Sequence, residues 1–238
     1  MRLDQALCAR GFAPSRHRAQ LLIDDRAVTI NGVLARKASQ AVLETDRIEV
    51  ANTIPYVSRA GLKLAHALEV FHIDPNELDC LDIGSSTGGF TDVLIQQGAA
   101  HVDAVDVGTN QLHESLRTHE RVDFFEQTDI RDFHPGKTYD LIVMDASFIS
   151  QLLIIPKIKE LARTGTIVIT LIKPQFEVGR DGIGKGGMVL SDELAQESVR
   201  RIIQAYTDAG FEQVASTTDS PILGGDGNRE YIAVFRKP

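Results

Sequence analysis

The sequence predicts an α/β protein with an open, mostly parallel sheet, preceded by a small α+β domain at the N-terminus. Beyond residue 58, short apolar segments of strand length alternate with helix-like segments, which is typical of a parallel sheet covered on both faces. Within the first fifty residues, two helical patterns are instead followed by a hairpin motif. The 238 residues, 43% of them apolar, suffice for one sizeable core and one small accessory domain.

The N-terminal segment is expected to form two short helices and a small sheet. Apolar residues recur at helical spacing within 3–7 and again within 19–23, with Pro14-Ser15 as a break and cap between them. Asn31-Gly32 strongly indicates a two-residue hairpin turn. A polar stretch that includes Pro55 predicts a linker at 51–57, which separates a domain at 1–50 from a domain at 58–238. The expected strands of the first domain are 28–30, 33–35 and 48–50.

The second domain is expected to contain a seven-stranded sheet. Its last two strands have a glycine-rich loop and no helix between them, so they should pair antiparallel. Seven strands with this ending are typical of the Rossmann-like class I methyltransferases, which use S-adenosylmethionine (SAM). The expected strands are 80–83, 101–106, 122–126, 139–144, 165–171, 211–217 and 231–235, and the expected helices are 59–70, 89–97, 111–117, 151–161 and 192–209.

Charge is distributed unevenly along the chain. The net charge is -8, but residues 1–40 carry seven Arg or Lys against three Asp, a net of +4 that leaves -12 for the remainder. A basic module that docks on a polyanion beside an acidic body would produce this asymmetry. By composition alone, a merely solvated basic face explains it equally well.

Residues 81–90 lead from a short apolar strand through a turn of small residues into a helix, so a ligand can approach the backbone closely. A dinucleotide fingerprint needs G-x-G-x-x-G, but Ser86 occupies the second glycine position, which points away from NAD and towards SAM. Asp106 is suited to accept both ribose hydroxyls, and Asp129, with the amide of Ile130, to bind the adenine amino group. Alternatively, both aspartates are ordinary turn and capping residues. The expected cofactor contacts are Asp82, Gly84, Ser85, Ser86, Thr87, Gly88, Gly89, Phe90, Asp106, Val107, Asp129, Ile130 and Asp145.

Four ionisable residues stand near the ends of expected elements. Lys173 closes an apolar strand, where a charge is costly unless it is paired or functional, and Pro174 keeps its backbone extended. Asp145 closes the preceding strand, Lys63 belongs to the first helix of the second domain, and Glu230 precedes the last strand. Considered singly, each of the last two has a simpler interpretation. Lys63 could have a solvated side chain, and Glu230 could be an ordinary acid at the start of a strand.

Together these four residues resemble the lysine-aspartate-lysine-glutamate tetrad of FtsJ-like 2′-O-methyltransferases, in the same order and elements. The first fifty residues resemble the S4-type RNA-binding module. The whole chain is similar to the TlyA family of ribosomal RNA methyltransferases, whose members are sometimes labelled haemolysins. The segments that carry these resemblances are 2–4, 15–16, 19–23, 28–32, 56–64, 82–92, 171–177 and 185–187.

The resemblance implies SAM-dependent methylation of a ribose 2′-hydroxyl of ribosomal RNA, at a cytidine, with catalytic residues Lys63, Asp145, Lys173 and Glu230. We expect Lys173 to orient or deprotonate the hydroxyl and Lys63 to steer the ribose or phosphate. The two lysines and the two acids shift the lysine pKa in opposite directions, so the sign stays open. The implied partner is ribosomal RNA or a ribosomal subunit, and no obligate protein partner is expected. The protein itself is expected to be a monomer or a dimer. The expected RNA contacts are Arg2, Arg16, Arg18, Arg36, Lys37, Arg59, Arg180 and Lys185.

Several other features of the sequence bear on function. The glycine-rich loop 179–187 is expected either to close over RNA or to be a flexible connection. The seven histidines lack ligand spacing and Cys8 and Cys80 lie far apart, so no metal site is expected. No apolar run approaches the roughly 18 residues of a membrane span, and residues 1–12 lack the apolar core of a signal peptide. We therefore expect a cytoplasmic protein without a membrane partner.

Three rival functions remain. An NAD-dependent oxidoreductase is disfavoured by Ser86 and does not explain the RNA-binding module. A ribosome-assembly factor that keeps SAM only as a structural ligand would differ in lacking methyl transfer. A membrane-lytic protein is disfavoured because the sequence has neither a spanning segment nor a strongly amphipathic cationic helix.

Overall fold

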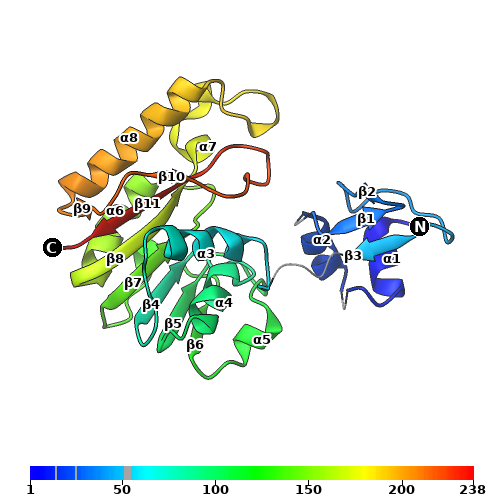
Figure 1. Cartoon of the computed structure of the whole chain (residues 1–238), viewed down its shortest axis with the longest axis horizontal. Helices are drawn as coiled ribbons and strands as arrows, with labels where there is room; N and C mark the ends of the chain where they lie inside the picture. The colour runs from blue at the N-terminus through cyan, green and yellow to red at the C-terminus, as the bar shows by residue number, and fades with distance from the viewer. Residues whose placement is uncertain (14, 25, 51–54) are drawn as a thin grey trace. The chain divides into compact units, whose positions relative to one another are not determined.

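The computed structural model describes residues 1–13, 15–24, 26–50 and 55–238, with the backbone alone at residues 17, 18, 21 and 24. They form two compact units, Met1–Arg59 and Ala60–Pro238, each with its own hydrophobic core (Figure 1). Pro14, the expected helix break, and residues 51–54 of the expected linker lie outside the described residues.

The first unit packs two helices against an antiparallel sheet of strand order β2-β1-β3. The turn between β1 and β2 has positive φ at both Asn31 (51°) and Gly32 (78°), as the common two-residue hairpin turn requires. These elements confirm the sequence expectation, except that the second strand ends one residue early. Their bounds are α1 Leu3–Ala9, α2 Arg16–Asp24, β1 Val28–Ile30, β2 Val33–Leu34 and β3 Ile48–Val50.

The second unit is built on a sheet of strand order β10-β11-β8-β7-β4-β5-β6, with β9 also paired to β11. From β8 to β6 neighbouring strands run parallel, and β11 runs antiparallel to β8. The predicted fold class, with its final antiparallel strand, is therefore confirmed. The strands are β4 Asp79–Ile83, β5 His101–Val105, β6 Val122–Phe125, β7 Tyr139–Met144, β8 Ala162–Ile172, β9 Glu212–Gln213, β10 Thr218–Asp219 and β11 Tyr231–Arg236.

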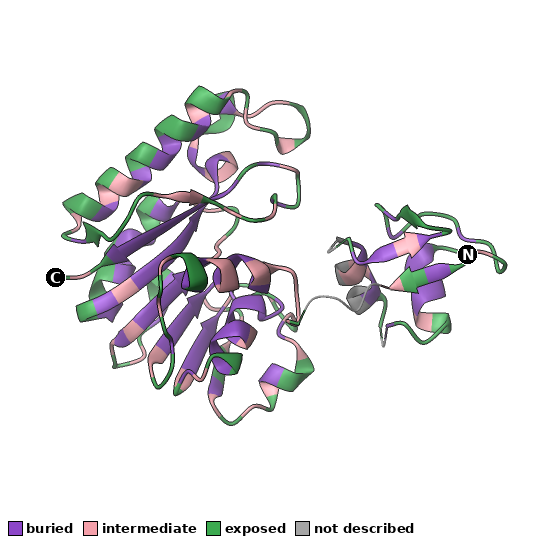
Figure 2. Ribbon diagram, viewed as in Figure 1, coloured by how far each residue is buried: buried purple, intermediate pink, exposed green. Residues whose placement is uncertain are grey.

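Helices cover both faces of this sheet, and most strand residues between them are buried (Figures 1 and 2). Alternate residues of a strand face opposite sides, so Leu81 and Ile83 join the core under α6 and α8 whereas Asp82 bonds to Thr91 of α4. The helices are α3 Ala60–Val70, α4 Gly89–Gln96, α5 Glu114–Arg117, α6 Ile155–Leu161, α7 Pro174–Glu177 and α8 Asp192–Asp208. Short 3₁₀ turns are η1 Ile130–Asp132, η2 Gln151–Leu153, η3 Arg180–Gly182 and η4 Lys185–Gly187.

Three expected elements differ from the structure. The expected helix 151–161 divides into η2 and α6, since Pro156 lacks an N–H and suits only the first turn of a helix. The expected helix 111–117 shortens to α5 because the amides of residues 110–112 bond to the Glu126 carboxylate instead of to a helix. The expected strand 211–217 is replaced by β9 and β10, each of which pairs antiparallel with β11.

Among the helices in the described part of the chain, none has the length and apolar character that crossing a membrane requires.

Candidate active site

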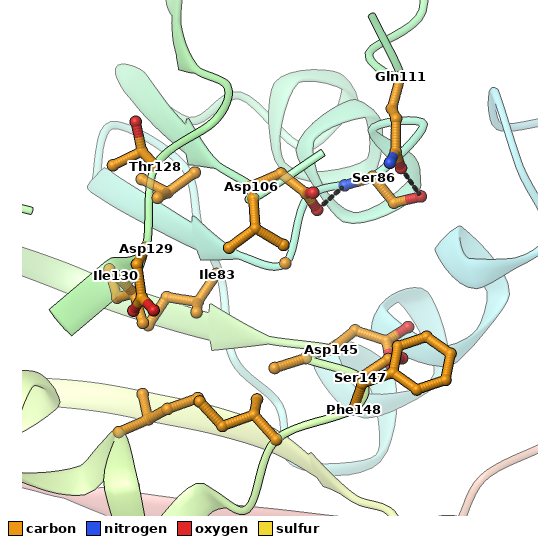
Figure 3. Close-up of a pocket in the computed structure, with 16 residues that line it drawn as sticks. Ile83, Ser86, Asp106, Gln111, Thr128, Asp129, Ile130, Asp145, Ser147 and Phe148 are labelled. Atoms are coloured by element: carbon orange, nitrogen blue, oxygen red, sulfur yellow. Dashed lines mark hydrogen bonds between the residues drawn. The ribbon is translucent and has the colours of Figure 1, made fainter. Parts of the chain in front are cut away.

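A cavity of about 400 Å³ lies at the carboxyl ends of β4, β5 and β7, where the strand order reverses. In Figure 3, Asp106 and Ser86 lie on one side of it and Asp145 and Phe148 on another. The expected cofactor residues that line it are Gly84, Ser86, Asp106, Val107, Asp129, Ile130 and Asp145. The sequence did not indicate the others, which are Ile83, Val105, Gln111, Thr128, Ala146, Ser147, Phe148, Ile149 and Ile154.

The glycine at position 84 lets two loops approach closely at the cavity. Gly84 has a φ of +79°, and a Cβ atom there would lie 3.0 Å from the Cα of Ala146, in the loop that follows β7. Any side chain would therefore push the loop after β4 away from the loop that carries Asp145.

Gly84→Ala is expected to destabilise the protein by about 1–3 kcal/mol and to weaken SAM binding, because it adds both left-handed backbone strain and a backbone clash. Urea unfolding and calorimetry would measure the two effects. Gly136→Ala is the matched control, since Gly136 has a φ of +71° but a Cβ atom added there would meet only open space. Equal losses in both variants would contradict a role for the close approach at Gly84.

Asp106 is held at the cavity wall by backbone amides. Its two carboxylate oxygens accept hydrogen bonds from Ser86 N (2.8 Å) and Gly108 N (2.6 Å). The Ser86 hydroxyl in turn donates to the side-chain oxygen of Gln111 at 3.1 Å (Figure 3). Since a carboxylate has about four acceptor positions, Asp106 keeps capacity for a ligand hydroxyl.

Glu126 fixes the segment that presents Gln111 to the cavity. Its carboxylate accepts from the amides of Asn110, Gln111 and Leu112 at 2.9–3.3 Å and from the Arg117 guanidinium. Burial alone would raise the pKa of Glu126, but these donors outweigh it and hold the pKa at about 2. The sequence does not indicate this anchor because its bonds join the end of β6 to an irregular loop.

Asp129 lies at the far end of the cavity and caps η1. Its carboxylate accepts from the backbone N–H of Arg131 (2.9 Å) and pairs with the Arg131 guanidinium (2.6 Å), which lowers the Asp129 pKa. The capping alternative from the sequence is thus confirmed for Asp129, and the residue also lines the cavity beside Ile130.

Six of the expected cofactor contacts are not among the residues that line the cavity. They are buried residues of β4, of the loop that follows it and of the start of α4. The glycine at position 88 serves packing, since a Cβ atom there would lie 2.3 Å from the Leu116 side chain. The six are Asp82, Ser85, Thr87, Gly88, Gly89 and Phe90.

Asp82 is a fully buried carboxyl group beneath the loop. One oxygen accepts from the Thr91 amide (2.9 Å) and hydroxyl (2.6 Å), and the other has no hydrogen-bond partner among the described residues. Burial raises the Asp82 pKa to about 7, with Asp145 and Asp106 adding to the shift and Thr91 opposing it.

Asp82→Asn is expected to flatten the pH dependence of stability. Because the folded-state pKa is raised, this group stabilises the fold fully below pH 3.8, and the contribution is lost as pH rises towards 7. The wild type should therefore lose up to about 4 kcal/mol relative to Asp82→Asn across that window. Urea unfolding at a series of pH values measures this, and parallel curves for the two proteins would contradict it.

The structure brings together the four ionisable residues that the sequence singled out. Lys63 Nζ lies 2.6 Å from Glu230 Oε2 and 3.4 Å from Asp145 Oδ2, and Lys173 Nζ lies 2.6 Å from Asp145 Oδ1. They come from α3, the ends of β7 and β8, and the start of β11. Asp145 also lines the cavity, so the cluster adjoins it. The solvated alternative for Lys63 is wrong, since the residue is 8% exposed.

The two acids keep Lys63 cationic. Burial, the largest influence, would lower the Lys63 pKa, but Asp145 and Glu230 outweigh it and the net shift is upward. Burial would likewise raise the Asp145 pKa, but Lys173 and Lys63 outweigh it and lower that pKa. The direction of the lysine pKa shift, which the sequence left open, is therefore upward for Lys63.

Lys173 is further held by the loop after β7. Its ammonium donates to the Asp145 carbonyl (3.2 Å) and the Ser147 hydroxyl (2.8 Å). In the same loop, Phe148 is 91% exposed, has a φ of +64°, and has its ring centroid 5.1 Å from that of Phe176. An exposed aromatic ring at the rim of a cavity suits stacking against a base.

The basic residues expected to bind RNA differ in their surroundings. Arg2 and Arg16 both pair with Asp4 (3.0 and 2.7 Å), yet about half of each side chain stays exposed. Arg36 and Lys37 are exposed, as are Arg180 and Lys185 in the second unit. Arg59 is partly buried, and the side chain of Arg18 lies outside the described residues.

The glycine-rich loop 179–187 is neither extended nor isolated. It forms η3 and η4, and its end is joined to the loop before β11 by Asn228, which accepts from Val189 N (3.0 Å) and donates to Gly187 O (2.9 Å).

Residues 56–237 match the model of the FtsJ-like methyltransferase family, and residues 1–48 match that of the S4 domain. Hemolysin A of Brachyspira hyodysenteriae is 42% identical over 239 residues, 99% of each chain. The 16S/23S rRNA (cytidine-2′-O)-methyltransferase TlyA of Mycobacterium tuberculosis is 41% identical over 240 residues, 99% of this chain and 89% of that protein. A solved structure from Streptococcus thermophilus, described as a candidate hemolysin, has a TM-score of 0.79 at 36% identity, covering 100% of this chain and 88% of that one.

Proposed function

This chain belongs to the TlyA family of FtsJ-like methyltransferases that carry an S4 domain, and from this premise we propose that it transfers a methyl group from SAM to a ribose 2′-hydroxyl of ribosomal RNA, at a cytidine. The observation that carries the proposal is the buried cluster of Lys63, Asp145, Lys173 and Glu230 beside the cavity. The RNA substrate makes the cytoplasm its proposed place of action.

The cavity suits SAM in size and in chemistry. Its volume lies within the usual range for small-molecule sites, and aliphatic side chains such as Ile83 and Ile130 form walls for a planar base. The Asp106 carboxylate is proposed to bind the ribose hydroxyls, and Asp129 with the Ile130 amide to bind the adenine. When bound, SAM supplies an electrophilic methyl group.

The lysine cluster is proposed to hold the acceptor hydroxyl. Lys173 orients the 2′-hydroxyl or, in its neutral amine form, takes up the hydroxyl proton when the oxygen is methylated, while Asp145 and Ser147 aim Lys173 Nζ. Lys63, whose pKa is raised, stays cationic and binds the ribose or the neighbouring phosphate. The exposed ring of Phe148 offers a stacking surface to the base that carries this ribose.

The first unit is proposed to supply affinity for RNA. It concentrates the positive charge of an otherwise acidic chain, with Arg36 and Lys37 exposed on it, and Arg180 and Lys185 extend the basic contacts to the second unit.

The test is methyl transfer from radiolabelled SAM to ribosomal RNA or ribosomal subunits from cells that lack this protein, followed by nuclease digestion and identification of the labelled nucleoside. We expect label in a 2′-O-methylcytidine. SAM binding without transfer to either substrate would instead indicate a non-catalytic assembly factor, and label on a base would refute ribose chemistry.

A further inference from the structure

The loop after β7 carries two groups that contact the proposed catalytic lysine, Lys173. Residues 145–149 line the cavity, and within them Asp145 and Ser147 contact the Lys173 ammonium. The loop is not held by regular secondary structure until η2 begins at Gln151. Its conformation must therefore be fixed by side-chain contacts, and the positive φ of Phe148 (+64°) adds strain that such contacts have to overcome.

Those contacts converge on Glu177. This residue ends α7, the short helix that begins directly after Lys173, and it is 5% exposed. Its carboxylate accepts hydrogen bonds from the Ser150 hydroxyl at 2.6 Å and from the backbone N–H of Gln151 at 2.9 Å. Its own carbonyl accepts from the guanidinium of Arg201 on α8, so the helix end is itself anchored.

A second layer of bonds ties the same point of the loop to β8. The Gln151 side chain donates to Leu171 O at 2.7 Å and accepts from the Thr170 hydroxyl at 3.0 Å. Gln151 is thus held both by the strand that ends in Lys173 and by the helix that follows it.

The loop is therefore clamped at both ends by one short stretch of chain. Lys173 holds its start through Asp145 and Ser147, and Glu177, four residues later, holds its end through Ser150 and Gln151. A buried carboxylate is costly, and burial raises the Glu177 pKa despite these donors. An apolar residue would fill the same space at less cost but could not bind the loop.

We propose that Glu177 is a positioning residue for methyl transfer. It fixes the position of loop 145–151 relative to α7, so that Asp145 and Ser147 keep the Lys173 amine directed at the acceptor hydroxyl. This inference rests on the proposed function and goes beyond the four clustered residues, since Glu177 contacts none of them in the bonds described.

The test compares Glu177→Ala with Glu177→Gln in the full-length protein. Alanine leaves the Ser150 hydroxyl and Gln151 amide without their acceptor, and a displacement of about 1 Å in the loop should lower kcat by about 10²-fold. Kd for SAM should change much less, because Asp106 and Asp129 lie on other loops. Glutamine should recover most of kcat, since its amide oxygen can accept from Gln151 N while the Ser150 hydroxyl turns to accept from its NH₂ group.

Glu197→Ala, which removes an exposed glutamate on α8, is the control. Hydrogen exchange of residues 145–152 gives a readout that does not depend on activity: it should rise in Glu177→Ala and stay near wild type in Glu177→Gln. The proposal would be overturned by a folded Glu177→Ala variant that keeps wild-type kcat and wild-type exchange. It would also be overturned if the loss in kcat were matched by the loss in SAM affinity, or if Glu177→Gln were as impaired as Glu177→Ala. A wild-type protein that transfers no methyl group would refute the proposed function instead, and the exchange comparison would still decide whether Glu177 holds the loop.

Discussion

Lys173→Ala is expected to lower kcat for methyl transfer by about 10²- to 10⁴-fold while leaving Kd for SAM within a few-fold of wild type. The ammonium lies at the edge of the cavity and not among its lining residues, whereas Asp106 and Asp129, the proposed cofactor contacts, lie on other loops. Removing it takes away the group that orients the acceptor hydroxyl but leaves the walls of the cavity in place.

Single-turnover transfer and calorimetry with SAM measure the two quantities separately. Lys159→Ala, at an exposed position of α6, is the control for loss of a lysine. Lys173→Arg adds information because arginine keeps the charge but cannot accept a proton, so its activity distinguishes orientation from proton uptake. Transfer by Lys173→Ala at the wild-type rate would remove this residue from the mechanism.

Asp145→Ala is expected to destabilise the protein by about 3–5 kcal/mol and to abolish transfer. Asp145 pairs with Lys173 at 2.6 Å and Lys63 at 3.4 Å, and both lysines are less than a tenth exposed. Among the described residues, the variant leaves the buried Lys173 ammonium without a carboxylate in ion-pair contact and leaves the Lys63 ammonium with Glu230 alone.

Urea unfolding measures the loss, with the exposed Asp181→Ala as the control. A second variant, Asp145→Ala combined with Lys173→Met, removes one of the stranded charges and should recover part of the stability. A single-variant loss below about 1 kcal/mol, the range of an exposed ion pair, would contradict the buried coupling of these side chains.

Much of the candidate site follows from the sequence because parallel strands end at one edge of a sheet. Once β4, β7 and β8 were expected to run parallel, Asp145 and Lys173 at their carboxyl ends had to lie near each other. The antiparallel return of β11 brings Glu230 to the same edge, where it meets Lys63. Hydrophobic periodicity indicates the strands and helices, whereas the meeting of all four side chains was implied by the resemblance to the FtsJ-like tetrad.

The contacts that the sequence does not indicate depend on side chains meeting across irregular segments. Gln111 reaches the cavity because Glu126 binds its backbone amide and those of its two neighbours. Ser147 reaches Lys173 because Glu177 anchors the loop beyond it. Asp82 is the reverse case, since strand alternation turns it towards α4 and away from the cavity. No spacing rule reports any of these bonds.

The most direct test of the account is a map of ribose methylation in ribosomal RNA from cells that lack this protein, complemented with the wild type or with Lys173→Ala. We predict that at least one cytidine loses its 2′-O-methyl group in the deletion strain, and that the wild type restores it whereas Lys173→Ala does not. An unchanged map in the deletion strain, or full restoration by Lys173→Ala, would contradict the claim that the lysine-carboxylate cluster directs methyl transfer to ribosomal RNA.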